Sequence, residues 1–342
     1  MKRMKKFYQF VSILLVLILV LAGCGGKPTK EVSSKAKTSS KGDIKVTIAG
    51  GSAGGLWSTI GEGLGESIKR SYPNSTFTYQ PGQDGANIMT VMTGQAEFGI
   101  VSASAAKWAY KGEKPYTSKM DKVRTVAYLH SMPYHFAVSE DSGISSIEQI
   151  VKEKMPLVAA VNTKNSPMEI SNRVVFKSYG SSYEQIEKNG GKIQYLAVSK
   201  ANDQIKDNKM DGSLSPLPTP AGNLIELNTS KPMKILPLSD KAIKAMEKEL
   251  AAKPYTIKAG TYPFVKKDIP TAAVDTILVT SADVPDDVVY KVTKAIYEHL
   301  DYLYTVHKSF EAVTKDTIAD VQGAPMHPGA EKFYKEAGIL KK

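Results

Sequence analysis

The first part of the chain alternates short runs of strand periodicity with longer runs of helical periodicity. Apolar and polar residues alternate over 44–48, which predicts a half-buried strand, and a glycine-rich turn separates it from an amphipathic helix expected at 56–71. Further strands are expected at 76–80 and 97–102, with a helix at 86–93 between them. Strand–helix–strand alternation predicts an α/β fold with a mostly parallel sheet covered by helices.

The second part of the chain continues this alternation. Residues 123–139 contain two strand-like runs, which we expect to be broken near Met132-Pro133. Ser145-Ser146-Ile147-Glu148 has the Ser-x-x-Glu spacing of a capping box, so a helix should start there and continue to about residue 152. The remaining expected elements are strands at 157–161, 193–198, 212–217 and 273–280, and helices at 168–178, 286–305 and 329–337.

The N-terminus has the pattern of a bacterial lipoprotein signal. Residues 2–6 carry four positive charges and no acid, and 10–22 follow as a run that is apolar apart from Ser12. This run is shorter than the ~20 apolar residues that span a bilayer, so we expect a signal peptide at 1–23. Its end, Leu21-Ala22-Gly23-Cys24, resembles the lipobox, in which a lipid joins the cysteine sulfur before cleavage. We therefore expect an extracytoplasmic protein, lipid-anchored through Cys24 to the outer face of the bacterial cell membrane.

Composition changes after the expected signal. Residues 24–42 are rich in Lys, Ser, Thr and Gly and poor in apolar residues, which is typical of a flexible tether. The formal charge of +11 falls to +7 without the signal, and the remaining Lys and Arg are scattered among acids, so no nucleic-acid partner is expected. Residues 43–342 have the length of two domains. The only cysteine of the chain, Cys24, is expected to carry the lipid, so no disulfide can form and apolar cores must stabilise the fold.

The turn Gly50-Gly51-Ser52-Ala53-Gly54-Gly55 allows two interpretations. It matches Gly-x-Ser-x-Gly, the nucleophile elbow of serine hydrolases, with His327 as a candidate base. Against this, the turn follows the first strand, a His-Gly-Gly-Gly oxyanion loop is missing from the sequence, and Pro328 indicates that a helix begins beside His327. The interpretation we favour is a carboxylate site, because unpaired N–H groups and the dipole at a helix start attract anions. A phosphate-binding loop for nucleotides is not indicated.

Three further polar turns occur at expected strand ends or helix starts, at 82–87, 102–104 and 162–167. Ligands of open α/β sheets bind beyond the carboxyl ends of the strands, so four such turns from both halves predict a solute held between two lobes. Trp57 is expected either in the core or as a wall of this cleft. The expected ligand-binding residues are Gly51, Ser52, Ala53, Trp57, Asp84, Asn87, Ser102, Ser104, Asn165, Ser166 and Thr219.

The charged and metal-binding residue types indicate neither a metal site nor a cofactor. His130 and His135 lie five apart on an expected strand and should face opposite ways, and His299 and His307 are expected to be solvated on a helix. None of the four turns contains an arginine, so backbone N–H groups should hold most of a solute carboxylate. Asp84 argues against a dianionic solute, and Lys164 offsets this in part.

Several motifs, in this order, resemble the TAXI branch of TRAP-transporter solute receptors over almost all of 44–340. Ile48–Trp57 is similar to the family's first ligand turn, where the aromatic is usually Tyr, and Gly94–Ile100 is similar to its "G-x-A-D" turn and strand. Asp141–Ile147 matches its entry to the second domain. The most specific matches are Ala259–Pro263, Asp268–Thr271, Leu278–Pro285 and Met326–Tyr334. The chain departs from the family at Asp84–Asn87 and Lys164–Pro167.

The resemblance implies a two-lobed type II periplasmic-binding-protein fold with a hinge and an interlobe ligand cleft. Lobe I would comprise 43–139 and 265–342, and lobe II would comprise 140–264. The implied function is capture of a small carboxylate-bearing solute, a glutamate-like amino acid or an organic acid, for delivery to a TRAP permease. We expect a monomer that is not an enzyme. The alternatives are an ABC-type solute-binding lipoprotein and, less favoured, a serine hydrolase that uses Ser52.

Overall fold

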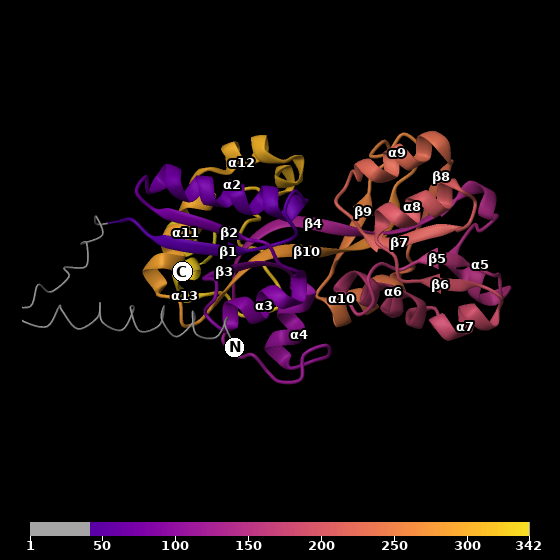
Figure 1. The fold of residues 1–342 in the computed structure, drawn as a ribbon, viewed down its shortest axis with the longest axis horizontal. Helices are drawn as coiled ribbons and strands as arrows, with labels where there is room; N and C mark the ends of the chain where they lie inside the picture. Colours follow the sequence, from indigo (N-terminus) through magenta and orange to yellow (C-terminus); the bar gives the residue numbers. More distant parts are fainter. Residues whose placement is uncertain (1–41, 342) are drawn as a thin grey trace, which may run out of the picture. The chain divides into compact units, whose positions relative to one another are not determined.

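A computed structural model describes residues 42–341 (Figure 1). The expected signal peptide, Cys24 and all but the last residue of the expected tether lie outside this range. The first elements are β1 Lys45–Ala49, α2 Leu56–Ser71, β2 Thr76–Gln80, α3 Asp84–Met92, β3 Phe98–Ser102, α4 Ala103–Lys111 and β4 Val123–Ser139. Next come η1 Glu140–Ser142, α5 Ile147–Lys152, β5 Val158–Ala160, α6 Pro167–Ser178, α7 Tyr183–Lys188, β6 Lys192–Gln194, α8 Val198–Lys206, β7 Gly212–Pro216, α9 Gly222–Ser230, β8 Met233–Leu236, α10 Asp240–Leu250 and β9 Lys253–Ile257. The last are β10 Ile269–Ser281, α11 Asp286–Glu298, α12 Leu300–Val306, η2 Lys308–Ala312 and α13 Pro328–Glu336.

The strands form one hydrogen-bonded path in the order β2-β1-β3-β10-β4-β7-β5-β6, with β8 paired to β4 and β9 paired to β10. At each end of the path, β1 is parallel to β2 and β3, and β5 is parallel to β6 and β7. The two long strands in the middle, β4 and β10, are antiparallel to each other and to their other neighbours. The expectation of a mostly parallel sheet is therefore wrong for the centre, where the chain passes from one half to the other and returns.

The break expected at Met132-Pro133 is absent from β4, which is one continuous strand. Pro133 lies where the strand changes partner, because Pro133 pairs with Ala273 of β10 and Tyr134 pairs with Pro216 of β7. A proline lacks an N–H to donate, but its carbonyl still accepts from Leu217 N at 3.0 Å. The proline thus marks a change of sheet partner and not the end of a strand.

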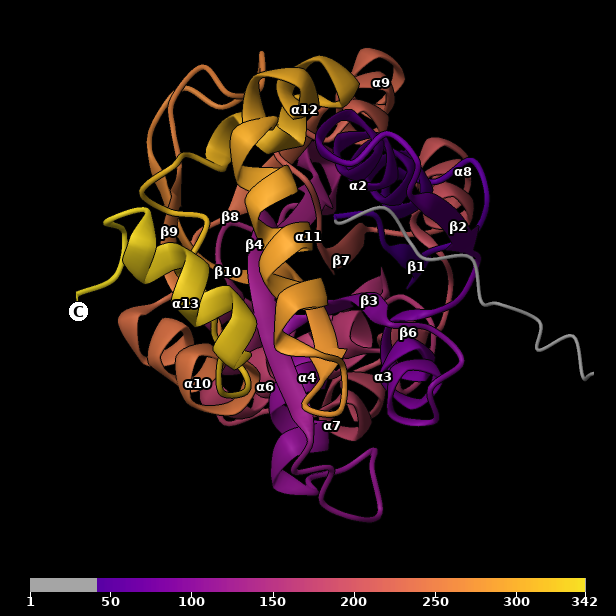
Figure 2. The same cartoon turned by 90° about the vertical axis from the view of Figure 1, so that its left-hand side faces the viewer.

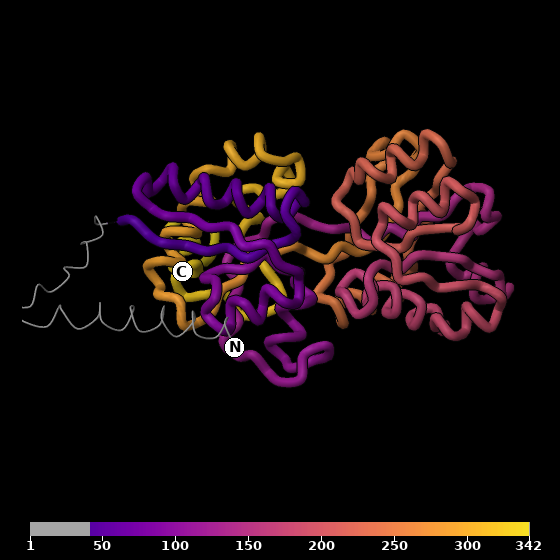
Figure 3. Tube along the Cα trace, viewed as in Figure 1, coloured from indigo at the N-terminus to yellow at the C-terminus, as the bar shows by residue number. Residues whose placement is uncertain are grey.

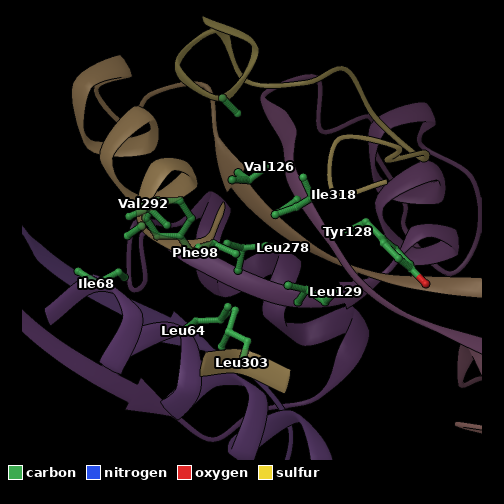
Figure 4. Packing of buried hydrophobic residues seen from close by; sticks show 14 of the residues in the cluster. Leu64, Ile68, Phe98, Val126, Tyr128, Leu129, Leu278, Val292, Leu303 and Ile318 are labelled. Carbon is green, nitrogen blue, oxygen red and sulfur yellow. The ribbon is translucent and has the colours of Figure 1, made fainter. Parts of the chain in front are cut away.

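Two sets of hydrophobic clusters divide the described residues into two lobes. The main cluster of lobe I includes Leu64 of α2, Phe98 of β3, Leu129 of β4 and Leu278 of β10, which converge in Figure 4. On the outer side of this lobe α13 lies beside α11 (Figure 2), and Phe333 meets Tyr290 edge-on with ring centres 5.5 Å apart. Two other clusters fill lobe II and share no residue with the main cluster of lobe I, although one of them includes Trp108 of α4 and Val274 of β10. In Figure 3 the trace passes between the lobes along β4 and β10.

Serine N-caps explain where many helices begin. In α4, α5, α6, α7 and α10 the hydroxyl of the residue before the helix accepts a hydrogen bond from the backbone N–H three residues later, which satisfies one of the free N–H groups of the first turn. For α5 the capping residue is Ser146 and not the expected Ser145, whose N–H instead donates to Gln149 Oε1 at 2.9 Å. The helix start shifts by one residue as a result.

Three other expectations need correction. The strand expected at 193–198 ends at Gln194, and Val198 begins α8. The helix expected at 286–305 is divided at His299 into α11 and α12. The two histidines there are half-buried at helix ends, with His299 Nε2 3.0 Å from Ser71 Oγ and His307 capping η2, so they are not simply solvated.

Candidate functional site

The turn after β1 presents free hydrogen-bond donors. No side chain caps α2, and its first turn contains no acid. Among residues 42–341, no acceptor is found for the N–H groups of Ser52, Ala53 and Leu56. Ser52 and Ala53 are also exposed. Unpaired N–H groups at the start of a long helix attract an anion, so these three donors are available to one.

Packing explains part of the glycine content of this turn. A Cβ on Gly50 would lie 2.4 Å from the Tyr79 hydroxyl, which donates to Gly51 O at 2.7 Å. Burial raises the pKa of Tyr79 to about 12, so this hydroxyl stays protonated and can donate. Trp57 is half-buried against the lobe I core, and a Cβ on Gly51 would lie 3.1 Å from Trp57 Cβ. The structure therefore gives Trp57 a packing role.

Asp84 binds the start of α4. Its Oδ1 accepts from Ser102 N at 2.8 Å, and Ser102 Oγ caps α4 by accepting from Ala105 N at 3.1 Å. Burial raises the pKa of Asp84 from 3.8 to about 6, although hydrogen bonds from Ser102 oppose the shift. The site that α4 offers to an anion is thus already filled by a carboxylate of the same lobe.

Buried asparagines tie neighbouring strand ends together in both lobes. Asn87 Nδ2 donates to Gly50 O at 3.0 Å and to Ile100 O at 2.8 Å, which joins the ends of β1 and β3. Asn172 Nδ2 donates to Val161 O at 3.3 Å and Leu214 O at 3.1 Å, which joins the ends of β5 and β7. The amide donors of Asn87 are therefore used within the protein, while its buried Oδ1 has no partner among the described residues.

One face of α4 is bonded to the C-terminus of α10 in lobe II. Ser104 Oγ donates to Leu250 O at 2.7 Å, Trp108 Nε1 donates to Glu249 O at 3.0 Å, and Lys107 Nζ donates to Lys248 O. The last carbonyls of a helix have no partner within the helix, and here donors from the other lobe satisfy three in succession. Ser104, expected to bind the solute, thus connects the lobes.

The turn before α6 is held rigid by its own side chains. Asn165 has a φ of 62°, its N–H donates to Glu169 Oε2 at 2.9 Å, and its Oδ1 accepts from Arg173 Nη2 at 3.2 Å. Ser166 Oγ accepts from Glu169 N at 3.2 Å and caps the helix. Asn and Asp tolerate this left-handed conformation better than most residues, which accounts for Asn165 at the bend.

A hydrogen-bond relay of His135, Tyr262 and Ala221, outside the lining of the interlobe pocket, lies beside Thr219. His135 Nδ1 is 2.8 Å from Pro133 O and so carries the proton, and burial lowers the pKa of His135 to about 4. The neutral ring therefore accepts at Nε2 from the Tyr262 hydroxyl, 2.8 Å away, and Tyr262 accepts from Ala221 N at 2.9 Å. Thr219 contacts the same hydroxyl. Tyr262 lies within Ala259–Pro263, one of the motifs that carry the family resemblance, and this motif was the only sequence feature that pointed to it.

A pocket of about 240 Å³ opens between the two lobes. Asp84, Asn165 and Ser166 are the three expected ligand residues that line it, and they come from both lobes. Gly51, Ser52, Ala53 and Trp57 do not line this pocket. Its full lining comprises Gln83, Asp84, Gly85, Ala86, Ala105, Trp108, Pro115 and Tyr116 of lobe I and Thr163–Pro167 of lobe II.

A model of the NMT1-like family matches residues 48–338. The chain belongs to the NMT1-like family. Three solved structures share the fold of this NMT1-like protein. A TctC solute binding protein from Polaromonas has 13% identity and a TM-score of 0.51, covering 80% of this chain and 88% of its own. MatC from Rhodopseudomonas palustris, with bound malate, has 14% identity and a TM-score of 0.50, covering 78% and 88%. The periplasmic binding protein BugD has 14% identity and a TM-score of 0.50, covering 87% and 99%.

These likenesses confirm the expected two-lobed periplasmic-binding-protein fold for the NMT1-like chain. The described part contains no helix long and apolar enough to cross a membrane and no group of residues that would hold a metal ion. His327 is buried, with Nδ1 accepting from Gly329 N at 3.1 Å and Nε2 3.1 Å from Val284 O. Both ring nitrogens are occupied at the start of α13, so His327 does not form a triad with Ser52.

Proposed function

We propose that this protein is an extracytoplasmic solute receptor that captures a small carboxylate-bearing solute between its lobes. The observation that carries the proposal is the interlobe pocket, to which both lobes contribute residues next to helix starts. Family membership and the shared fold support the receptor class, and one neighbour in fold, MatC, holds malate. A solute that touches both lobes binds the closed state better than the open one, so capture drives closure.

We propose that lobe I comprises 43–139 and 265–342 and that lobe II comprises 140–264. We propose that the solute reaches from the interlobe pocket to the adjacent 50–55 turn, whose free N–H groups would receive its carboxylate, with Ser52 donating and the exposed part of Trp57 forming one wall. A hydrogen bond to a charged group contributes ~1.5–3 kcal/mol, so a few bonds are enough for micromolar binding, at about −8 kcal/mol. The exposed Ser52 would act as a donor and not as a nucleophile.

A thermal-shift screen of amino acids and organic acids tests this proposal. Glutamate-like amino acids or organic acids should raise the melting temperature of the wild type, since binding to the folded state alone stabilises it. Ser52→Ala should weaken this response, whereas Thr229→Ala, an exposed hydroxyl on α9, should leave it unchanged. A rise with sugars or cations alone would contradict the carboxylate proposal. Stoichiometric reaction of Ser52 with a fluorophosphonate would instead support a hydrolase.

The TAXI resemblance extends the proposal to the membrane partner. We propose delivery of the solute by a monomeric receptor to a TRAP-type permease, driven by an ion gradient, with an ABC-type receptor as the alternative. The neighbouring genes separate the two, because a fused TRAP permease supports the first and an ATPase pair supports the second. Lipid anchoring through Cys24 predicts labelling by a palmitate analogue that Cys24→Ser abolishes, and labelling that persists in this variant would refute the anchor.

A further inference from the structure

A second pocket lies in lobe II, on the other side of the turn that lines the interlobe pocket. It has a volume of about 440 Å³ and shares only Lys164 with the interlobe pocket. Lys164 follows β5, and Tyr195 comes directly after β6, which is parallel to β5. The pocket therefore lies at the carboxyl edge of these strands, where α/β sheets bind ligands.

Positive charge dominates the lining of this pocket. Lys164, Arg173 and Lys177 face a single lining acid, Glu184, while two acids outside the lining, Glu169 and Glu249, pair with Arg173 and Lys177. Arg173 is fixed by the fully buried Glu169, with Nε 2.6 Å from Oε1 and Nη2 2.8 Å from Oε2. Its Nη1 has no acceptor among residues 42–341, and no carboxylate in that range pairs with Lys164. A guanidinium that is held in place by one carboxylate and has a further N–H group free can donate hydrogen bonds to an anion with little loss of side-chain freedom.

Two tyrosines supply flat apolar surface beside these cations. The Lys164 ammonium lies 5.3 Å from the ring centre of Tyr195, and Arg173 lies 5.9 Å from that of Tyr183. The two rings meet edge-on at 6.4 Å. Tyr195 is 41% exposed, and within the described part only one other large hydrophobic side chain, Met89, stands out in the same way. An exposed aromatic face next to Lys164, which has no carboxylate partner among residues 42–341, suits a ligand with a planar body.

A hydroxyl in the pocket lacks a partner. Ser181 Oγ is buried and makes no hydrogen bond within the described residues, although Ser181 lines the pocket. Leaving a buried hydroxyl unpaired costs free energy, and an anionic oxygen in the pocket would remove that cost.

We propose that this pocket, the Lys164 pocket, is a second ligand site, which binds a carboxylate or phosphate attached to a planar ring. Lys164 and Arg173 bind the anionic oxygens, Ser181 donates a further hydrogen bond, and the ring stacks on Tyr195. The site is distinct from the interlobe pocket, with which it shares only Lys164.

Calorimetric titration of the full-length, detergent-solubilised protein with benzoate and phenyl phosphate tests the proposal. Both should bind, inorganic phosphate should bind more weakly, and phenol should not bind. Lys164→Gln should weaken binding about tenfold, the loss of one charged hydrogen bond. Lys188→Gln, on α7 but outside the pocket, is the matched control and should bind as the wild type does.

Two further variants separate a binding role from a structural one. Tyr195→Leu should remove the preference for phenyl phosphate over inorganic phosphate. Ser181→Ala should raise the melting temperature of the ligand-free protein and yet weaken anion binding, a combination that a purely structural serine would not give. The proposal is overturned if neither aryl anion binds at millimolar concentration, or if binding is the same in Lys164→Gln and the wild type. Weaker binding in Lys164→Gln with no change in Tyr195→Leu and Ser181→Ala would place these anions in the interlobe pocket, which Lys164 also lines, and would overturn the proposal.

Discussion

The amide of Asn172 should be among the most costly side chains to remove from lobe II. The two hydrogens of its Nδ2 are shared among Val161 O, Leu214 O and Met168 O, the last at 3.0 Å, and its Oδ1 accepts from the buried Tyr134 hydroxyl at 2.6 Å. Each such bond contributes ~1 kcal/mol, and a buried polar group left unpaired costs ~1–3 kcal/mol. Asn172→Ala removes both donor hydrogens and the acceptor, and leaves the Tyr134 hydroxyl without its partner. We expect the free energy of unfolding to fall by ~3 kcal/mol.

Urea denaturation followed by circular dichroism measures this loss. Asn189→Ala is the matched control, because its exposed amide bonds only Gln185 at 3.0 Å, and it should change stability by less than ~0.5 kcal/mol. Tyr134→Phe should cost less in the Asn172→Ala background than in the wild type, with a coupling of ~1–2 kcal/mol, because the unpaired hydroxyl is then already present. A loss below ~1 kcal/mol for Asn172→Ala, or additive effects, would refute the reasoning.

Three other substitutions test separate parts of the structure. The folded-state pKa of Asp84 is about 6, above the ordinary 3.8, so its contribution to stability is present below pH 4 and lost as the pH rises through 6. In urea melts, Asp84→Asn should therefore be more stable than the wild type by ~2–3 kcal/mol at pH 8 and equally stable at pH 3. Ser104→Ala should lower the free energy of unfolding by ~1–2 kcal/mol because Leu250 O loses its donor from the other lobe, and an unchanged urea midpoint would argue against the connection. Tyr262→Phe leaves His135 Nε2 and Ala221 N without partners and should cost ~2–3 kcal/mol by the same assay, whereas a loss within error would show that water replaces the hydroxyl.

Local pattern in the sequence was enough to predict many of the elements. The first strand, the helix at Leu56–Ser71 and the strand at Thr76–Gln80 lie where expected, because hydrophobic periodicity and glycine turns act over a few residues. Pro328 at the first position of α13 was likewise predictable from its fixed φ. The two-lobed fold followed from the resemblance and is confirmed by the shared architecture.

Tertiary structure alone decided the partners of the polar side chains. Ser104 donates to the carbonyl of Leu250, 146 residues away, and Asn87 donates to that of Gly50, 37 residues away. Neither role can be predicted from the neighbouring residues in the sequence. The sequence around Pro133 predicts that a strand ends there. The strand β4 nevertheless continues, because it pairs with β10 up to Pro133 and with β7 from Tyr134 onward. Lys164 and Tyr195 meet only because parallel strands β5 and β6 bring the segments that follow them to one edge. Secondary structure depends on neighbours in the chain, whereas a binding site depends on which distant groups remain unpaired after folding.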